Sequence, residues 1–263
     1  MNNTFQRCEI KYLLHETAFQ NLTAVLAGYM EADGNCSADS TYHIYNIYFD
    51  TENDDIIRRS LAKPYYKEKL RLRSYTIPHS ESDRVFLELK KKIGGVVCKR
   101  RAEMRLDEAN RFVATGQAPA GAGYLDRQVI SEIAYFLRCY PVAPRVAINY
   151  QRMAFYGRED RDLRITFDTN IRTRRHSLAL VQGGGGRDLL EECPYLMEIK
   201  TVGALPLWLA RVLSTNGVYR TSFSKYGTEY KRYLKERSAR VLEMPRASFC
   251  QPLTQASACC VNL

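Results

Sequence analysis

The sequence lacks the short motifs that identify several common classes of protein. Its 263 residues include 8 cysteines but no C-x-x-C pair, and no histidine stands at metal-ligand spacing from a pair of cysteines. There is no P-loop pattern, and no G-x-G-x-x-G follows a predicted strand, so we expect the glycine-rich stretch 181–188 to be a flexible loop without a phosphate-cradling role. These absences argue against a zinc module, a P-loop enzyme and a dinucleotide-binding domain.

Long apolar segments are also missing. No apolar run approaches the ~20 residues that span a bilayer, and the N-terminal residues lack the apolar core of a signal peptide. The sequence therefore predicts a reduced, cytoplasmic protein without an integral membrane segment, in which most cysteines pack as small apolar residues. For the cysteines near the C-terminus, lipidation and metal binding remain alternatives to a loose tail.

Negative charge is scarce relative to positive charge. The chain has 39 Lys+Arg against 29 Asp+Glu, a net charge of +10, which favours an anionic partner such as nucleic acid, acidic lipid, nucleotide or polyphosphate. Nucleic acid is not expected, because the sequence shows no helix-turn-helix, zinc module or stacking-aromatic motif. The four histidines are interpreted as structural or exposed and not as catalytic: His15, His43, His79 and His176.

Alternating and helical patterns predict an α+β fold in one domain. The predicted strands are 5–14, 42–51, 67–76, 84–93, 96–106, 145–157, 163–175 and 196–201. The predicted helices are 15–30, 107–116, 126–140, 205–217 and 225–243. Because hairpins dominate, we expect a mainly antiparallel sheet with helices packed outside it. The domain is expected to cover residues 1–237, followed by a loose tail over 238–263.

Most of the predicted strands place charge on one face and apolar residues on the other. In 67–76, Lys67, Lys69, Arg71 and Arg73 occupy alternate positions, which point to the same face of a strand. A solvated face of an antiparallel sheet is the simpler explanation of any one such strand. Six of them, dense in Arg and Lys, would crowd like charges in one sheet, which is destabilising unless an anion neutralises them. The set therefore favours a barrel whose interior binds a linear polyanion.

The few carboxylates on these faces suggest a metal site. They cannot bind phosphate directly, but they suit Mg²⁺ or Mn²⁺ that bridges to phosphate oxygens. Glu198 is the preferred metal ligand, and Glu9 is a second candidate. The alternative for Glu198 is a salt bridge to a neighbouring Lys or Arg.

A set of stretches in fixed order resembles the VTC domain, the polyphosphate polymerase branch of the triphosphate tunnel metalloenzymes. They run across about residues 5–235 and are RCEIKYLL, YFDT, KLRLRSY, VFLELKKK followed by KRR, YQRMAFYG, LRITFDTNI, LMEIKT and SFSKYGTEY. The resemblance implies a closed, mainly antiparallel β-barrel that forms a basic tunnel with acidic metal ligands. It implies ATP-dependent synthesis of inorganic polyphosphate, with ATP and polyphosphate as partners and Mn²⁺ or Mg²⁺ as cofactor.

The resemblance also assigns roles to residues. Carried over by motif, the catalytic, phosphate-binding residues are Lys11, Arg71, Arg73, Lys90, Arg152, Arg164 and Lys225, with the metal on Glu198. Further phosphate-binding candidates on the charged faces are Arg7, Lys69, Lys99, Arg101 and Lys200. Lys90 is chosen over its two lysine neighbours because it shares a face with Glu88. A bulge or twist is needed if Arg152 and Asn149 are both to face inward.

One departure bears on the reaction. Hydrolytic and cyclase members of the superfamily carry Glu-x-Glu-x-Lys in the first strand, whereas the matching positions here are Arg7, Glu9 and Lys11. The exchange of one Glu for Arg favours the polymerase branch. A metal-dependent triphosphatase or polyphosphatase and a non-catalytic polyphosphate- or nucleotide-binding protein remain alternatives.

Overall fold

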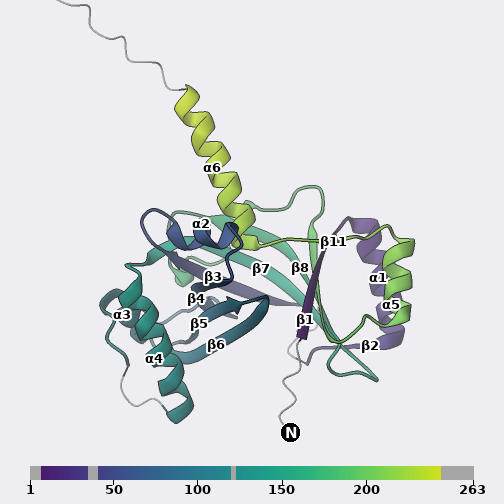
Figure 1. Ribbon diagram of the computed structural model, residues 1–263, viewed down its shortest axis with the longest axis horizontal. Helices are drawn as coiled ribbons and strands as arrows, with labels where there is room; N and C mark the ends of the chain where they lie inside the picture. Colours follow the sequence, from purple (N-terminus) through teal and green to yellow (C-terminus); the bar gives the residue numbers. More distant parts are fainter. Residues whose placement is uncertain (1–6, 35–40, 120–122, 244–263) are drawn as a thin grey trace, which may run out of the picture. The chain divides into compact units, whose positions relative to one another are not determined.

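The computed structural model describes residues 7–34, 41–119 and 123–243 (Figure 1). The chain divides into two compact units, Met1–Tyr230 and Lys231–Leu263, and all residues of the predicted site lie in the first. Cys36 and the segment 244–263, which holds Cys250, Cys259 and Cys260, lie outside the described residues. The tail boundary at residue 238 and the alternatives for the C-terminal cysteines therefore stay predictions.

The fold is α+β, with one large antiparallel sheet. The strands are β1 (Arg7–Leu14), β2 (Met30–Ala32), β3 (Tyr42–Asp50), β4 (Tyr66–Ser74), β5 (Arg84–Ile93), β6 (Val96–Arg105), β7 (Ala143–Gly157), β8 (Arg164–Arg174), β9 (Arg187–Asp188), β10 (Tyr195–Val202) and β11 (Arg220–Thr221). Their order is β11-β1-β10-β8-β7-β3-β4-β5-β6, with β2 paired to β7 and β9 paired to β8.

The sheet is not closed by strand pairing. Its path ends at β11 on one side and at β6 on the other, and no pairing within the described ranges joins these ends. The mainly antiparallel sheet that we predicted is thus confirmed, whereas the closed barrel is not.

The described ranges contain six α-helices, and none of them is long and apolar enough to cross a bilayer. They are α1 (Glu16–Tyr29), α2 (Asp55–Leu61), α3 (Leu106–Thr115), α4 (Tyr124–Cys139), α5 (Leu207–Thr215) and α6 (Lys225–Glu243), with a short 3-10 turn η1 (Leu180–Gln182). All five predicted helices are present. The helix α2 was not predicted, because its seven residues are too few to show a helical period.

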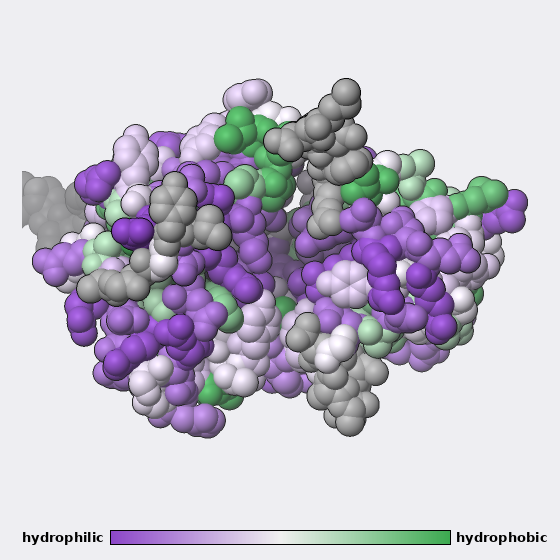
Figure 2. Space-filling model, turned by 90° about the horizontal axis from the view of Figure 1, so that it is seen from below, coloured by the Kyte–Doolittle hydropathy of each residue, from purple (hydrophilic) through white to green (hydrophobic). Residues whose placement is uncertain are grey.

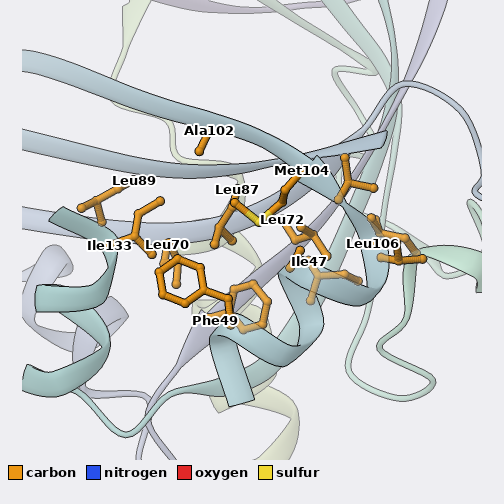
Figure 3. Close-up of a cluster of buried hydrophobic side chains, with 14 of the residues drawn as sticks. Ile47, Phe49, Leu70, Leu72, Leu87, Leu89, Ala102, Met104, Leu106 and Ile133 are labelled. Atoms are coloured by element: carbon orange, nitrogen blue, oxygen red, sulfur yellow. The ribbon is translucent and has the colours of Figure 1, made fainter. Parts of the chain in front are cut away.

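Two hydrophobic cores lie on the outer face of the sheet, as the alternation predicts. One is formed by β3 to β6 with α3 and α4, and Figure 3 shows Leu70, Leu72, Leu87 and Leu89 of this core beside Ile133 of α4. The other is formed by β1, β8 and β10 with α1 and α5, which lie side by side in Figure 1. Since both cores use the apolar faces, the charged faces point to the other side.

The prediction that most cysteines pack as small apolar residues is wrong for the four that are described. Cys8, Cys98 and Cys139 are exposed and Cys193 is half-buried. Cys8 lies near the start of β1, Cys98 near the Gly94–Gly95 turn and Cys139 at the end of α4. The ends of strands and helices have few packing neighbours. A cysteine at such an end therefore stays exposed although its side chain is apolar.

Candidate functional site

The charged faces of the strands point into a common interior. β1 and β5 are far apart in the strand order, yet Glu9 of β1 and Lys90 of β5 lie close enough that each shifts the pKa of the other. Figure 2 shows the surface hollowed near its centre, with hydrophilic residues on both sides of the hollow. The sheet is therefore curved around its charged face, which we call the inner face.

A buried carboxylate organises the cations of β4 and β6. Glu88 of β5 is fully buried, and its Oε2 lies 2.6 Å from Arg71 and 3.9 Å from Arg73, while its Oε1 lies 3.0 Å from Lys99. Burial alone would raise the pKa of Glu88, but Arg71, Arg73 and Lys99 outweigh burial and lower the pKa to about 2. Glu88 is therefore an anion that fixes the direction of two arginines.

A second group of ion pairs joins β1, β7, β8, β10 and the start of α6. Arg152 binds the fully buried Asp168 in bidentate fashion, at 2.5 and 2.7 Å, and Lys225 binds the same carboxylate. Glu198 lies 3.4 Å from Lys11, 3.6 Å from Arg152 and 3.7 Å from Lys225. Burial opposes the ionised form of Glu198, yet Lys225, Lys11 and Arg152 hold its pKa well below the usual range.

Two tyrosines lie among these cations, and one of them, Tyr150, contacts both groups. The hydroxyl of Tyr48 accepts a hydrogen bond from Arg71 at 3.2 Å, and the hydroxyl of Tyr150 accepts one from Arg73 at 3.1 Å. The Tyr150 ring also lies 4.5 Å from Lys225 Nζ. Burial raises the pKa of Tyr48, but Arg71 and Arg73 outweigh it and lower the pKa to about 8. The inner face is thus so cationic that even a phenol is pushed toward ionisation.

Regular alternation along β7 puts Arg152 on the same inner face as Tyr150. The register of β7 against β8 shifts between Asn149 and Gln151, so that Arg152 stands opposite Asp168. β8 contributes the extra residue, and Asn170 there takes a left-handed conformation with φ 51°. This bulge lies in β8, so β7 alternates regularly from Asn149 to Arg152 and the two side chains keep opposite faces: Arg152 points inward, and Asn149 donates to the carbonyl oxygen of Gly183.

Because of the bulge in β8, the prediction that Arg172 and Arg174 share a face with Arg164 and Asp168 is wrong. Beyond it, Arg172 is exposed and pairs with Asp188 at 3.2 Å, away from Asp168. Arg174 is buried and donates to the carbonyl oxygens of Gly183 and Gly185, both at 2.8 Å. The glycine-rich loop that we predicted as flexible is thus held by a buried arginine, because the bulge turns that side chain toward it.

Other predicted residues lie farther from the two ion-pair groups. Arg164 pairs with Asp33 at 3.2 Å, and its Nε is buried without a hydrogen bond to any described group. Lys200 is half-buried opposite Glu9 in the register of β10 and β1. Arg101 is exposed and lies over the Phe86 ring at 4.1 Å. Arg7 begins β1, and its side chain is not described.

Lys90 and Lys91 point to opposite faces. Lys90 interacts with Glu9 and Glu198 across the interior, whereas Lys91 donates to Glu132 of α4 at 2.9 Å on the outer face. The four histidines, which were not expected to be catalytic, are all exposed: His15, His43, His79 and His176.

The carboxylates present fit a divalent metal only together with phosphate. No group of three or more His, Cys, Asp or Glu within the described ranges is arranged to hold a metal. Glu198 and Glu9 offer hard oxygen donors next to Lys11, and Mg²⁺ commonly takes one or two carboxylates plus substrate phosphates. Phosphate oxygens would also offset the three cations that already surround Glu198.

Glu88 and Asp168 are site residues that the sequence did not predict. Both were on predicted charged faces, and each was an acid among cations in its strand. In the strand register, Glu88 stands opposite Arg71 and Asp168 stands opposite Arg152. A prediction of how the strands pair would therefore have indicated that each carboxylate orients an arginine.

Comparison with known proteins agrees with this geometry. The model of the VTC domain family matches residues 6–234. No curated protein matches the sequence. A solved structure of a candidate adenylate cyclase from Bacillus halodurans is 13% identical, with a TM-score of 0.50, and the match covers 83% of this chain and 95% of that chain.

Two further solved structures are more distant. The Mediator head module of Schizosaccharomyces pombe is matched at 10% identity and a TM-score of 0.40, over 80% of this chain and 90% of that chain. The Mimivirus capping enzyme triphosphatase is matched at 7% identity and a TM-score of 0.32, over 80% of this chain and 88% of that chain. The family match, with the likeness to the Bacillus halodurans fold, supports a triphosphate tunnel fold.

Proposed function

Because this chain belongs to the VTC domain family, we propose that it is an ATP-dependent polyphosphate polymerase. The γ-phosphoryl group of ATP would pass to the end of a growing polyphosphate chain on the inner face. The observation that carries the proposal is the buried set Glu88, Asp168 and Glu198, which holds arginines and lysines from four strands and α6 in fixed directions.

The residues present suit this transfer. The bond from the γ-phosphorus to the oxygen that bridges to the β-phosphate breaks, a bond to a terminal oxygen of the chain forms, and ADP leaves. Such a step needs placement in line and neutralised oxygens more than covalent help. Arg71 and Arg152, each oriented by a carboxylate, offer planar forks to phosphate oxygens. The acceptor oxygen is already ionised, so no general base is required.

A divalent metal, Mn²⁺ or Mg²⁺, would be held by Glu198, with Glu9 beside it. When bound, it would supply charge neutralisation and orientation at the triphosphate. Lys11 would link the two carboxylates, since it lies 3.1 Å from Glu9 and 3.4 Å from Glu198. We place ATP, polyphosphate and the metal on the inner face and expect the reaction to take place in the cytoplasm.

A non-catalytic polyphosphate- or nucleotide-binding protein is the second candidate. It is favoured by the three cations around Glu198, which satisfy this carboxylate without a metal. The same tunnel with water as acceptor would make a triphosphatase or polyphosphatase. The three functions differ in their products.

The deciding experiment incubates the pure protein with ATP and Mn²⁺ and resolves polyphosphate from orthophosphate. We expect polyphosphate; orthophosphate alone would indicate a hydrolase, and no product would indicate a binding protein. Glu198→Gln keeps the shape of the side chain and should lower turnover by on the order of 10²–10³. Polyphosphate affinity should persist or increase, since a negative charge leaves a cationic interior. Glu192→Gln, which alters an exposed side chain, is the control.

The metal titration separates catalysis from a structural salt bridge. If Glu198 serves only as a salt bridge, Glu198→Gln lowers the melting temperature and leaves the Mn²⁺ dependence of turnover unchanged. An active variant with the wild-type metal dependence would remove Glu198 from the metal site.

A further inference from the structure

Lys225 differs from the other cations around Glu198 because it comes from a helix and not from a strand. It is the first residue of α6. Between the end of α5 and Lys225, only the two residues of β11 pair with a strand, where they stand opposite Tyr12 and Lys11 of β1. A two-residue strand constrains the chain little. The place of the Lys225 ammonium therefore depends on how the start of α6 is held.

The start of α6 is held by two buried polar contacts. Tyr226 and Glu229 are 2% and 4% exposed. The hydroxyl of Tyr226 donates to Asp50 at 2.9 Å. Arg175, the residue after β8, donates to both carboxylate oxygens of Glu229, at 2.8 and 2.9 Å. Such a bidentate pair fixes direction as well as distance, so the Arg175–Glu229 pair sets the orientation of α6.

Arg175 is in turn held by a second buried carboxylate. Its guanidinium lies 3.4 Å from Asp54, which is 5% exposed and also accepts a hydrogen bond from Arg145 of β7 at 3.1 Å. Asp54 immediately precedes α2. Through Arg175, the start of α6 is therefore tied to β7, β8 and α2, and its orientation does not depend on Lys225 itself.

Lys225 and Glu229 are coupled by the helix. They are four residues apart, so they lie on the same face of α6, at the beginning and the end of its first turn. Each is bound to β8 or to the residue after it, Lys225 through Asp168 and Glu229 through Arg175. A rotation of α6 that breaks the pair with Arg175 therefore also moves Lys225.

We propose that Arg175 and Glu229 are positioning residues for Lys225, which set the direction from which its ammonium approaches a bound phosphate chain. This inference rests on the proposed function, because it requires Lys225 to contact phosphate. Lysine offers a point charge on a flexible stem and cannot fix its own direction as an arginine does. Arg175 and Glu229 do not contact the ligand in this arrangement and act through Lys225.

The first test measures tripolyphosphate affinity by isothermal titration, without ATP. Glu229→Gln keeps the shape of the side chain and removes its negative charge. The change in charge alone would strengthen binding of an anion, whereas displacement of Lys225 should weaken it about three- to tenfold. Arg175→Lys keeps the positive charge but cannot form the bidentate pair, so it should weaken binding about two- to threefold.

The second test asks whether Glu229 acts through Lys225. Lys225→Met should weaken tripolyphosphate binding about tenfold. In that background, Glu229→Gln and Arg175→Lys should each cause less than about a twofold further loss, because the group that they position is gone. A role of the pair in stability alone would lower the melting temperatures and would not produce this dependence on Lys225.

Glu132→Gln is the matched control. It removes the same charge from a carboxylate that also binds a lysine and an arginine, Lys91 and Arg100, but in α4 on the outer face. Tripolyphosphate affinity should not weaken in this variant. Melting temperatures show whether each variant is folded, and Arg175→Lys decides the question if Glu229→Gln does not fold.

Three results would overturn the inference. They are an unchanged or increased affinity in folded Glu229→Gln and in Arg175→Lys, losses that multiply fully with that of Lys225→Met, and a loss in Glu132→Gln as large as that in Glu229→Gln. None of these results depends on product formation. Failure of the wild type to make polyphosphate would overturn the proposed function and leave this comparison of affinities intact.

Discussion

Each buried carboxylate on the inner face holds more than one cation. Glu88 contacts Arg71, Arg73 and Lys99, and Asp168 contacts Arg152 and Lys225. A carboxylate that is shared in this way leaves part of each cation's hydrogen-bonding capacity for a further anion. At the scale of the residue, the site is therefore an arrangement of cations that are held in place but not fully neutralised.

Glu88→Gln should destabilise the protein strongly. The change leaves Arg71, Arg73 and Lys99 without their anion in a fully buried position, and loss of one partner of a buried ion pair costs about 3–5 kcal/mol. Urea unfolding measures the loss. Tripolyphosphate should restore part of the stability by supplying the missing charge. Glu132→Gln, on the outer face, removes a carboxylate that is 26% exposed and should cost less than about 1 kcal/mol. Equal losses in the two variants would contradict a special role for Glu88.

Lys69 should make the folded protein more stable as the pH rises from about 8 to about 10. Its pKa is about 8 in the folded protein, against an ordinary value of 10.5. Between these values the unfolded chain keeps a proton that the folded protein has released, so the free energy of unfolding rises with pH, by at most about 3 kcal/mol. The lowered pKa of Tyr48 acts in the same direction. Urea unfolding across this range should show a smaller rise for Lys69→Met, and identical profiles would refute the assignment.

At the scale of the element, alternation predicted the strands well because each has one apolar face that must be buried. Leu70, Leu72, Leu87 and Leu89 all lie in the outer core, and β4 and β5 pair without a register shift. Alternation failed in β8, where one extra residue moves every later side chain to the other face. Nothing in the local sequence around Asn170 distinguishes a bulge from a regular strand.

The glycine-rich loop depends on the strand that it covers. Gly186 has φ 139°, and a Cβ there would lie 2.6 Å from the carbonyl oxygen of Thr173 in β8. Gly186→Ala should therefore lower stability by about 2 kcal/mol or more and displace the loop from β8. Gly185→Ala is the control, because a Cβ at Gly185 meets nothing within 4 Å and should change stability by less than about 0.5 kcal/mol. Thermal unfolding of both variants measures the difference, and similar melting temperatures would show that the loop tolerates displacement.

At the scale of the whole molecule, the sequence predicted a cationic interior but not how the carboxylates share it. The net charge of +10 and the alternating faces indicate a polyanion as partner. The meeting of Lys11 from β1 with Arg152 from β7 and Lys225 from α6 at Glu198 depends on sheet curvature, which no single strand encodes. The resemblance to the VTC domain identified Lys11, Arg152, Lys225 and Glu198 from the order of the motifs. Glu88 and Asp168 could be identified only from the register that places each opposite an arginine.

A site of this kind should bind its ligand with a strong dependence on salt. Each cation that contacts phosphate replaces a counterion, so the logarithm of tripolyphosphate affinity should fall linearly with the logarithm of salt concentration. By analogy with single-stranded nucleic acid, Lys90→Gln should reduce the slope by about 0.7 if Lys90 makes one phosphate contact. Lys91→Gln changes the net charge equally but points to α4, so its slope should match that of the wild type.

The comparison of Lys90→Gln with Lys91→Gln distinguishes direct contact between a lysine and phosphate from attraction by the net charge of the protein. If net charge alone attracted the ligand, the two variants would lower affinity and slope to the same extent, since they differ by one position in β5. If the inner face binds phosphate directly, only Lys90→Gln changes the slope, and a charge on the outer face is screened over about 10 Å at 0.1 M salt. Isothermal titration at several salt concentrations gives both slopes. A flat dependence in the wild type would mean that phosphate does not meet the inner cations at all.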